Sequence, residues 1–408
     1  MAGLLRQRDV RLIVGAVGVS SVGDFLLWVP LTLYLQHTTG SAIVVAGLFL
    51  ALWTPAVVLA PFAGWLVDRL EARAVLIVAS FAQAAVAASL AFVLDSTAAI
   101  LVLAVLLGIG FSVAQPAEFS LVPVIGGATA RLTEINGLVE TARYTGATAG
   151  PLLGGLLAGL GGTRAAMFVN AASFLVVALA GLTLRARRRA ERAELEQPDR
   201  LRDGVVVLFR ERTLALVLSV VLVSLLFMSA SISAEVFFVK RNLHVSDFGY
   251  GFIFACWTVG MTLGSLVIAR RVRAAALATG ALVAVGVQGF GLGLPTAWLV
   301  IPFGCALWFV GGLGHGTKNV LARTLIQEQV PSRLHGRAFA AYNGLRNGAE
   351  LIALAAGGLL VAVIGARTTL ALAGAIPLLA AFAGLALYRA RGGTEEIPSS
   401  SAPSRLSA

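Results

Sequence analysis

The chain alternates between long apolar runs and short breaks of charged residues, glycine or proline. Each run is close to the ~20 apolar residues that a helix needs to cross a bilayer. The runs are apolar on every side, whereas strands of a membrane β-barrel alternate apolar and polar positions. The pattern predicts an all-α polytopic membrane protein with twelve transmembrane spans, at residues 12–34, 42–66, 74–94, 98–122, 138–160, 165–184, 214–238, 248–269, 275–294, 297–320, 339–364 and 367–388.

The longest polar stretch divides the chain into two sets of six predicted spans. An Asn-Gly-Leu triplet opens the fifth span of each set, at residues 136–138 and 343–345. Repetition at matching places indicates a duplicated transporter with two pseudo-symmetric halves. We predict an N-terminal half at residues 1–185, a cytoplasmic central loop at 186–212, a C-terminal half at 213–390 and a disordered cytoplasmic tail at 391–408.

Composition excludes a soluble globular protein, because 58% of the residues are hydrophobic and 12% are charged, against about 25% charged in soluble domains. The formal charge of +11 comes from basic residues in the loops, 24 on one side of the predicted bundle and four on the other. Basic loops mark the cytoplasmic side. We therefore expect a multi-pass protein of the cytoplasmic (inner) membrane with both termini in the cytoplasm, and no nucleic-acid partner. Cys256 and Cys305 lie within apolar runs and indicate neither a disulfide framework nor a metal site.

Two local motifs carry more information than the apolar runs. The break after the second span reads GWLVDRLEAR, residues 64–73, where aspartate and arginine can form charge pairs that break and reform as helices move. An ordinary basic loop is the alternative.

In the fifth span, glycines recur every four residues beside a proline that bends the helix. This spacing makes a smooth groove for a neighbouring helix; simple packing of small residues is the alternative. The motif consists of Gly137, Gly146, Gly150, Pro151, Gly154 and Gly155.

With two six-span halves, the first motif resembles the signature turn of the major facilitator superfamily. Gly64, Leu66, Asp68, Arg69 and Arg73 match that signature. The resemblance implies a conformational latch on the cytoplasmic face, weakened here because residues 71 and 72 are Glu and Ala, where the family often has a glycine and a basic residue.

The second motif resembles the signature of the drug:proton antiporter branch, and all six of its positions match. Nearly the whole chain, including Asp24, Pro116 and the loop at 330–337, is similar to exporters that include macrolide efflux proteins and the enterobactin exporter. This resemblance implies outward transport of amphiphilic or siderophore-like molecules. The arginine that many drug antiporters carry in the fourth span is missing here, so proton coupling by that residue is not implied.

Ionisable residues inside spans are costly and are functional candidates. Asp24, near the middle of the first span, is the first candidate to exchange a proton or bind a cationic substrate; a carboxylate that only hydrogen-bonds neighbouring helices is the alternative. Glu118 and Arg143 share an inner depth, so they can pair across helices or serve coupling, with Glu140 as another partner for the arginine.

Further ionisable groups occur in the second half. Arg346 and Glu350 are four residues apart, so one helix face can carry both as a pair or for coupling. We expect Lys318 and His315 to extend toward the cytoplasmic interface, and Glu235 to belong to a solvated outer rim with Lys240 and Arg241.

Aromatic residues in several spans can bind hydrophobic cations or macrocycles through stacking and cation–π contact, although most aromatic residues in a helix bundle only pack against neighbouring helices. The candidates for a cavity are Trp28, Phe227, Trp257 and Trp308.

Taken together, these patterns predict a secondary active exporter of small amphiphilic molecules that works by alternating access, without a bound cofactor or metal and driven by the proton gradient. Its expected partners are the lipid bilayer, protons and the substrate, and it is expected to work as a monomer. Uptake or exchange of a polar nutrient such as a sugar or amino acid is the alternative, against which stand the glycine motif and the scarcity of polar residues in the spans. No nucleophile motif or metal spacing supports an enzyme.

Overall fold

The computed structural model describes residues 4–126, 132–160, 162–185, 201–330 and 335–391, and in these residues the regular structure is helical, with no strand. Nine of its helices are long and apolar enough to cross a membrane. They are α1 (Arg8–Thr39), α4 (Ala72–Leu90), α5 (Thr97–Gly126), α7 (Thr163–Thr183), α9 (Arg212–Arg241), α10 (Asp247–Leu263), α11 (Leu277–Gly293), α13 (His335–Ile364) and α14 (Ala366–Ala390).

Three further crossings complete the bundle within the described residues. They are made by α2 (Ala42–Val58) with its continuation α3 (Ala60–Arg69), by α6 (Leu132–Gly159) and by α12 (Ile301–Gln329). The described residues thus contain twelve membrane crossings. The predicted all-α fold with twelve spans is therefore confirmed. A short helix, α8 (Leu201–Arg210), lies in the segment that the sequence assigned to the central loop, and it packs on α13 and α9. Residues 186–200 of that loop and 392–408 of the tail lie outside the described part of the chain.

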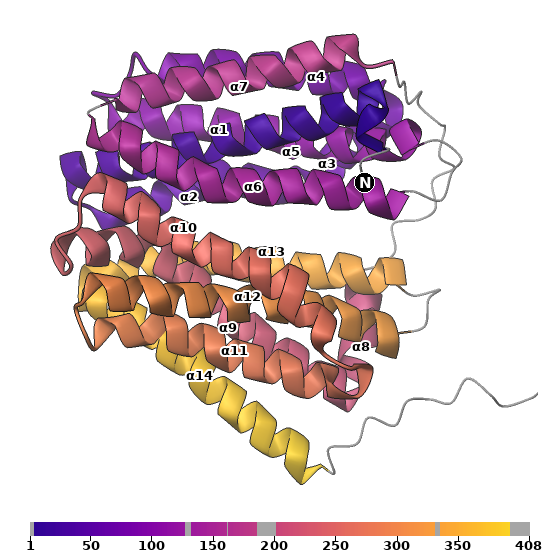
Figure 1. Cartoon of the computed structure of the whole chain (residues 1–408), viewed down its shortest axis with the longest axis vertical. Coiled ribbons are helices and arrows are strands. Elements are labelled where there is room, and N and C mark those ends of the chain that lie inside the picture. Colours follow the sequence, from indigo (N-terminus) through magenta and orange to yellow (C-terminus); the bar gives the residue numbers. More distant parts are fainter. Residues whose placement is uncertain (1–3, 127–131, 161, 186–200, 331–334, 392–408) are drawn as a thin grey trace, which may run out of the picture.

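The helices run antiparallel in sequence order, so their loops gather at two ends of the bundle (Figure 1). We call the end where α1 begins and α14 finishes the terminal end, and the opposite one the distal end. Short signals set the distal loops. Gly40 ends α1 with a positive φ of 62°, and the Ser41 hydroxyl accepts a hydrogen bond from the Val44 amide at the start of α2.

The two halves repeat one packing pattern. In the first half α1 packs on α6 and α7, and α4 packs on α5 and α7. In the second half the equivalent helices do the same, since α9 packs on α13 and α14, and α11 packs on α12 and α14. Figure 1 shows the halves one above the other, with helices 1–7 in indigo to magenta and helices 9–14 in rose to yellow.

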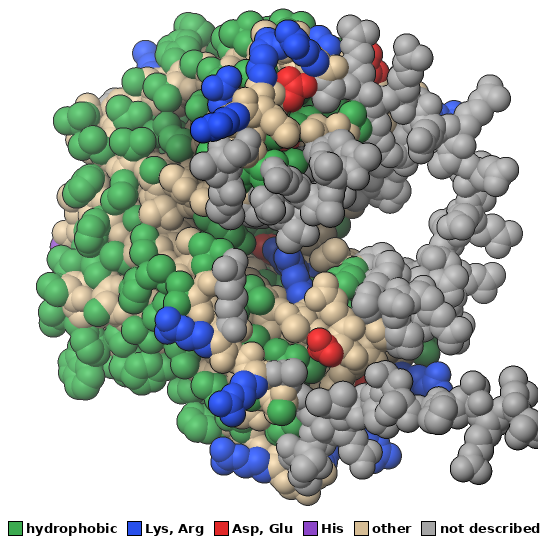
Figure 2. Space-filling model, turned by 45° about the vertical axis from the view of Figure 1, so that its right-hand side comes forward, with side chains coloured by type: hydrophobic (Ala, Val, Ile, Leu, Met, Phe, Trp, Pro, Cys, Tyr) green, Lys and Arg blue, Asp and Glu red, His purple; other side chains and the backbone are tan. Residues whose placement is uncertain are grey.

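The halves meet at the distal end through two helix pairs, α6 with α10 and α2 with α13. A side chain at Gly358 of α13 would lie 2.6 Å from Ala46 Cβ of α2, which shows how closely those helices approach. Two hydrogen bonds between described residues of the two halves are also distal: His37 to Asp247, at 3.2 Å, and the Arg241 guanidinium to the Gly40 carbonyl, at 3.1 Å. At the terminal end the surface is hollowed between the halves (Figure 2). The bundle is thus closed distally and open toward the terminal end.

A candidate transport pathway between the halves

The pathway begins, on the terminal side, in a polar cavity of the N-terminal half with a volume of about 300 Å³. Asp24, Glu118 and Arg143 all line it, so the structure brings together three of the residues that the sequence singled out. They come from α1, α5 and α6. Ser21, Ser80, Gln83 and Gln115 add polar groups to the same wall. We call this space the inner cavity.

Asp24 lies at the middle of α1, and its Oδ1 atom is buried without a hydrogen-bond partner. A buried carboxylate oxygen in that condition is costly unless a proton or a ligand satisfies it. The position of Asp24 is fixed by the residue before it. Gly23 packs closely against Ser173 and Asn170 of α7, and this contact holds the turn of α1 in place. The carboxylate therefore lines the inner cavity with one oxygen that accepts no hydrogen bond from the described residues.

Glu118 and Arg143 form an ion pair across helices, with 2.6 Å between Arg143 Nη2 and Glu118 Oε1. Both side chains are partly exposed to the cavity, at 15% for Glu118 and 27% for Arg143. The backbone carbonyl of Arg143 also accepts a hydrogen bond from the Ser21 hydroxyl at 2.9 Å, which ties α6 to α1 three residues before Asp24. The two charged groups near Asp24 in this cavity thus pair with each other, and the Asp24 carboxyl lies outside that pair.

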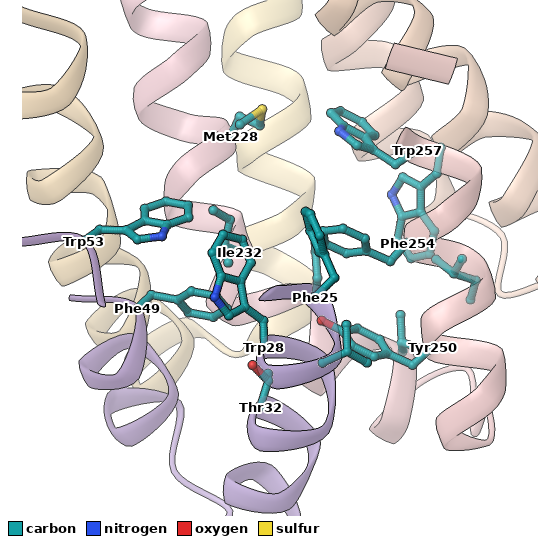
Figure 3. Close-up of a pocket in the computed structure, with 15 residues that line it drawn as sticks. Phe25, Trp28, Thr32, Phe49, Trp53, Met228, Ile232, Tyr250, Phe254 and Trp257 are labelled. Carbon is teal, nitrogen blue, oxygen red and sulfur yellow. The ribbon is translucent and has the colours of Figure 1, made fainter. Parts of the chain in front are cut away.

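Beyond Asp24, toward the distal end, lies a second space that we call the aromatic cavity, of about 120 Å³. Figure 3 shows Phe25 and Trp28 from α1 between Phe49 and Trp53 of α2 on one side and Tyr250, Phe254 and Trp257 of α10 on the other. Phe25, Trp28 and Trp53 also line the inner cavity, so these rings are the partition between the two spaces. The ring centroids of Trp28 and Trp53 are 5.6 Å apart, an edge-to-face contact.

Three of the four aromatic candidates from the sequence, Trp28, Trp257 and Trp308, line the aromatic cavity. The fourth, Phe227, does not; it packs partly buried against the core, and the next residue, Met228, lines the cavity instead. One helical position turns a side chain by about 100°, which is enough to move it from the cavity to the core.

Glu235 also lines the aromatic cavity, and this corrects its assignment to a solvated outer rim. The two cations that follow it along α9 are engaged elsewhere. Lys240 is paired with Asp247 at 2.5 Å, and Arg241 binds the Gly40 carbonyl. The carboxylate and these cations therefore do not form one surface cluster.

Lys318 on α12 is fully buried, so it does not extend to the membrane interface as its sequence position suggested. Its Nζ donates to the Ser224 hydroxyl at 2.9 Å, and that hydroxyl donates to Gln288 Oε1 at 3.0 Å. His315 is also buried; its Nε2 is 3.0 Å from the Asn319 amide, and its ring lies against Trp257. These groups form two polar clusters in the interior of the C-terminal half, Lys318–Ser224–Gln288 and His315–Asn319.

Arg346 and Glu350 share one face of α13, but no hydrogen bond or ion pair joins them in the described structure. Both are partly buried. The close pair that their spacing allowed is not formed in this state, so the structure gives no ion pair for a coupling role here.

The residues of the turn motif lie at the terminal end of the N-terminal half. Gly64, Asp68 and Arg69 lie in α3, and Arg73 lies in the first turn of α4. The guanidinium of Arg73 donates to the Leu182 carbonyl at the end of α7, at 2.8 Å. This contact joins helices of the same half, so a latch between the halves is not formed at Arg73 in this state.

The glycine motif of the fifth span runs along α6, where Gly137 is near the start. Gly146, Gly150 and Gly154 face α1, because a side chain at any of them would meet that helix; at Gly154 the added Cβ would be 3.1 Å from the Phe25 carbonyl oxygen. The groove that the spacing predicted is therefore present, and α1 occupies it.

Gly155 and Pro151 of the same motif face the other half instead. A Cβ at Gly155 would lie 2.7 Å from the Asp247 carbonyl oxygen, and one at Gly251 would overlap the Pro151 carbonyl. The motif thus supplies both the packing surface inside the N-terminal half and the distal closure between the halves.

Comparisons with known proteins agree with this architecture. The Major Facilitator Superfamily profile matches residues 13–239 and 216–407, and no curated protein matches the chain. Among solved structures, a nucleoside transporter, NupG, superposes with a TM-score of 0.71 at 16% identity, over 92% of this chain and 99% of that one. A POT family transporter in complex with 5-aminolevulinic acid superposes with a TM-score of 0.74 at 9% identity, over 94% and 96% of the two chains. Two halves with repeated packing around a central pathway, and a family profile that spans both, lead to one conclusion: the chain belongs to the major facilitator superfamily and is a multi-pass membrane transporter.

Proposed function

We propose that this transporter exports small amphiphilic molecules of the drug, macrolide or siderophore-like kind, in exchange for protons. In this proposal the terminal end faces the cytoplasm, the protein works as a monomer in the cytoplasmic membrane, and it needs no cofactor. The structure then corresponds to the inward-open state, from which substrate enters the inner cavity.

One observation carries the proposal: Asp24 presents a carboxylate oxygen without a hydrogen-bond partner in the wall of the inner cavity. A proton can satisfy that oxygen in one facing state and leave in the other. Coupling requires such a difference between states, because a ligand that binds both equally drives nothing. The neighbouring Glu118–Arg143 pair is already neutralised, so Asp24 is the proton carrier of the proposed cycle.

Export rather than uptake is supported by two features. The wall of the aromatic cavity is mainly rings and aliphatic side chains, with Thr32, Glu235 and Tyr250 among its few polar members. The glycine motif of α6 matches the pattern of drug antiporters and sits where the halves close. An amphiphilic substrate finds apolar surface here that a sugar would not use.

Uptake of a polar nutrient is the second candidate, and it is favoured by the names of the similar structures, a nucleoside transporter and peptide transporters. At identities between 9% and 16% that likeness concerns the fold alone. The polar inner cavity is the feature of this chain that would serve such a substrate.

The test is transport by the purified protein in liposomes with an imposed pH gradient. The wild type and Asp24→Asn are compared for movement of a fluorescent lipophilic cation, a macrolide, a nucleoside and a dipeptide. Asp95→Asn, which removes an exposed carboxylate from the distal loop between α4 and α5, is the control. We expect gradient-driven efflux of the amphiphiles in the wild type and control, and a loss of at least about tenfold in Asp24→Asn.

Each failure points in a different direction. Movement of the nucleoside or dipeptide without the amphiphiles would replace export by the uptake alternative. Gradient-driven efflux that survives in Asp24→Asn would remove Asp24 from the coupling path while leaving the exporter standing.

A further inference from the structure

We propose that the aromatic cavity binds a hydrophobic monocation and that the Glu235 carboxylate is the counter-ion of that cation. The inference rests on the proposed function, whose substrate class it narrows from amphiphiles in general to organic cations. It assigns proton and substrate to two different carboxylates, Asp24 and Glu235.

Glu235 meets the first requirement of such a site, a carboxyl group without a cationic partner among the described residues. Its one hydrogen bond comes from the Ser231 hydroxyl, a long contact of 3.4 Å to Oε1. No arginine or lysine of the described residues forms an ion pair with it. The carboxylate lines a cavity at the same time, so a ligand can reach it.

The rings meet the second requirement, since a cation is attracted to aromatic faces within about 6 Å. Phe25 lies between Trp28 and Phe254, with centroid distances of 5.0 Å and 5.9 Å, so rings from both halves of the bundle meet around one space. Trp257 extends this wall on the same helix as Phe254. An organic cation can therefore bury its apolar groups here while its charge stays near Glu235.

The cavity also holds three polar groups that are buried without a hydrogen-bond partner: Trp28 Nε1, Trp308 Nε1 and Thr32 Oγ1. Two indole N–H groups can only donate, and buried donors without partners are costly. A ligand that also carries a carbonyl, ether or hydroxyl oxygen would satisfy them. The expected substrate is thus an organic cation with an oxygen acceptor on an otherwise apolar frame.

The volume of about 120 Å³ is below the ~300 Å³ of ordinary ligand sites. Since Phe25, Trp28 and Trp53 separate this space from the inner cavity of about 300 Å³, rotation of these rings joins the two. We therefore expect the rings of Phe25, Trp28 and Trp53 to rotate when a cation binds.

The experiment measures equilibrium binding of radiolabelled tetraphenylphosphonium to the detergent-solubilised protein, with triphenylphosphine oxide as a neutral competitor of similar shape. Glu235→Gln keeps the shape of the side chain and removes its charge. We expect it to weaken tetraphenylphosphonium binding by at least about tenfold and to leave the affinity for the neutral competitor unchanged. Glu235→Asp should recover part of the affinity, and Asp95→Asn should bind as the wild type does.

Equal binding of tetraphenylphosphonium by the wild type and Glu235→Gln would overturn the inference, as would a parallel loss of both ligands or no cation binding by the wild type. If Glu235→Gln does not fold, the test uses the wild type only. The inference then requires that the wild type bind tetraphenylphosphonium about tenfold or more tightly than triphenylphosphine oxide. Binding that depends on Glu235, without movement of any amphiphile in liposomes, would leave the site standing and reject the exporter.

Discussion

Lys318 holds its amino group in the interior of the C-terminal half, where its hydrogen bond goes to Ser224. Burying a charge without an ionic partner is expensive, and even a buried ion pair can often be replaced by apolar residues of similar volume with no loss of stability or a gain of about 1–4 kcal/mol. We predict that Lys318→Met unfolds at the same or a higher temperature than the wild type in detergent.

The matched control is Lys240→Met, which removes the partner of Asp247 at the distal end and should lower the unfolding temperature. If Lys318→Met unfolds at a lower temperature than the wild type, the hydrogen bond to Ser224 contributes more than the cost of burying the amine, and the prediction is wrong.

The sequence placed Asp24 correctly in the middle of its span, while its role stays a prediction, and it misplaced Glu235 for a geometrical reason. Asp24 has no charged neighbour within its span, so its sequence position alone marked it. Glu235 is followed by Lys240 and Arg241, and the sequence grouped the three. At about 100° per residue, those cations lie roughly 140° and 120° around the helix from Glu235. They point away from the cavity that Glu235 lines, and only the packing of α9 against its neighbours shows which face is which.

At the scale of the element, α6 carries two packing faces that the glycine pattern alone could not separate. Gly150 packs on α1, where an added Cβ would be 3.0 Å from the Val22 carbonyl oxygen. Gly155 packs on the backbone of α10 in the other half. The spacing predicted a groove correctly, but which neighbour fills each part of it depends on the tertiary arrangement.

We predict that Gly155→Ala shifts the protein toward distal opening, because the methyl group pushes α6 from α10. Overpacking of this kind costs about 1–3 kcal/mol, and here the cost falls only on the distally closed state. Spin labels at Ser96 and Trp298, exposed distal positions in the two halves, should report a longer distance.

Gly150→Ala is the matched change within one half. It should lower the unfolding temperature and leave the distance between the spin labels unchanged. If the two variants change that distance alike, α6 responds as a whole and the two faces are not independent.

At the scale of the whole molecule, the twelve spans follow from the apolar runs, which any facing state must bury in lipid or protein. The facing state does not follow from them, because in the proposed alternating-access cycle one sequence forms both states with nearly the same packing inside each half. The contacts that close the observed state are distal and join segments far apart in the sequence, such as Gly358 with α2 and His37 with Asp247.

If the halves rock as rigid bodies, a covalent link at the distal interface must stop transport, while a link inside one half must not. In a background with both native cysteines replaced by serine, we predict that oxidation of Ala46→Cys with Gly358→Cys abolishes efflux and that a reductant restores it. The relevant Cβ atoms lie 2.6 Å apart across the halves, so the helices need to part by about 1 Å for a disulfide.

Gly18→Cys with Ala142→Cys is the control, because these positions lie 3.5 Å apart between α1 and α6 of the same half. Mass spectrometry of free thiols establishes that each bond has formed. Full efflux by the oxidised 46–358 protein would show that the distal interface does not need to open. Loss of efflux in both pairs would show that motion within the N-terminal half, rather than rocking of the halves, carries the substrate.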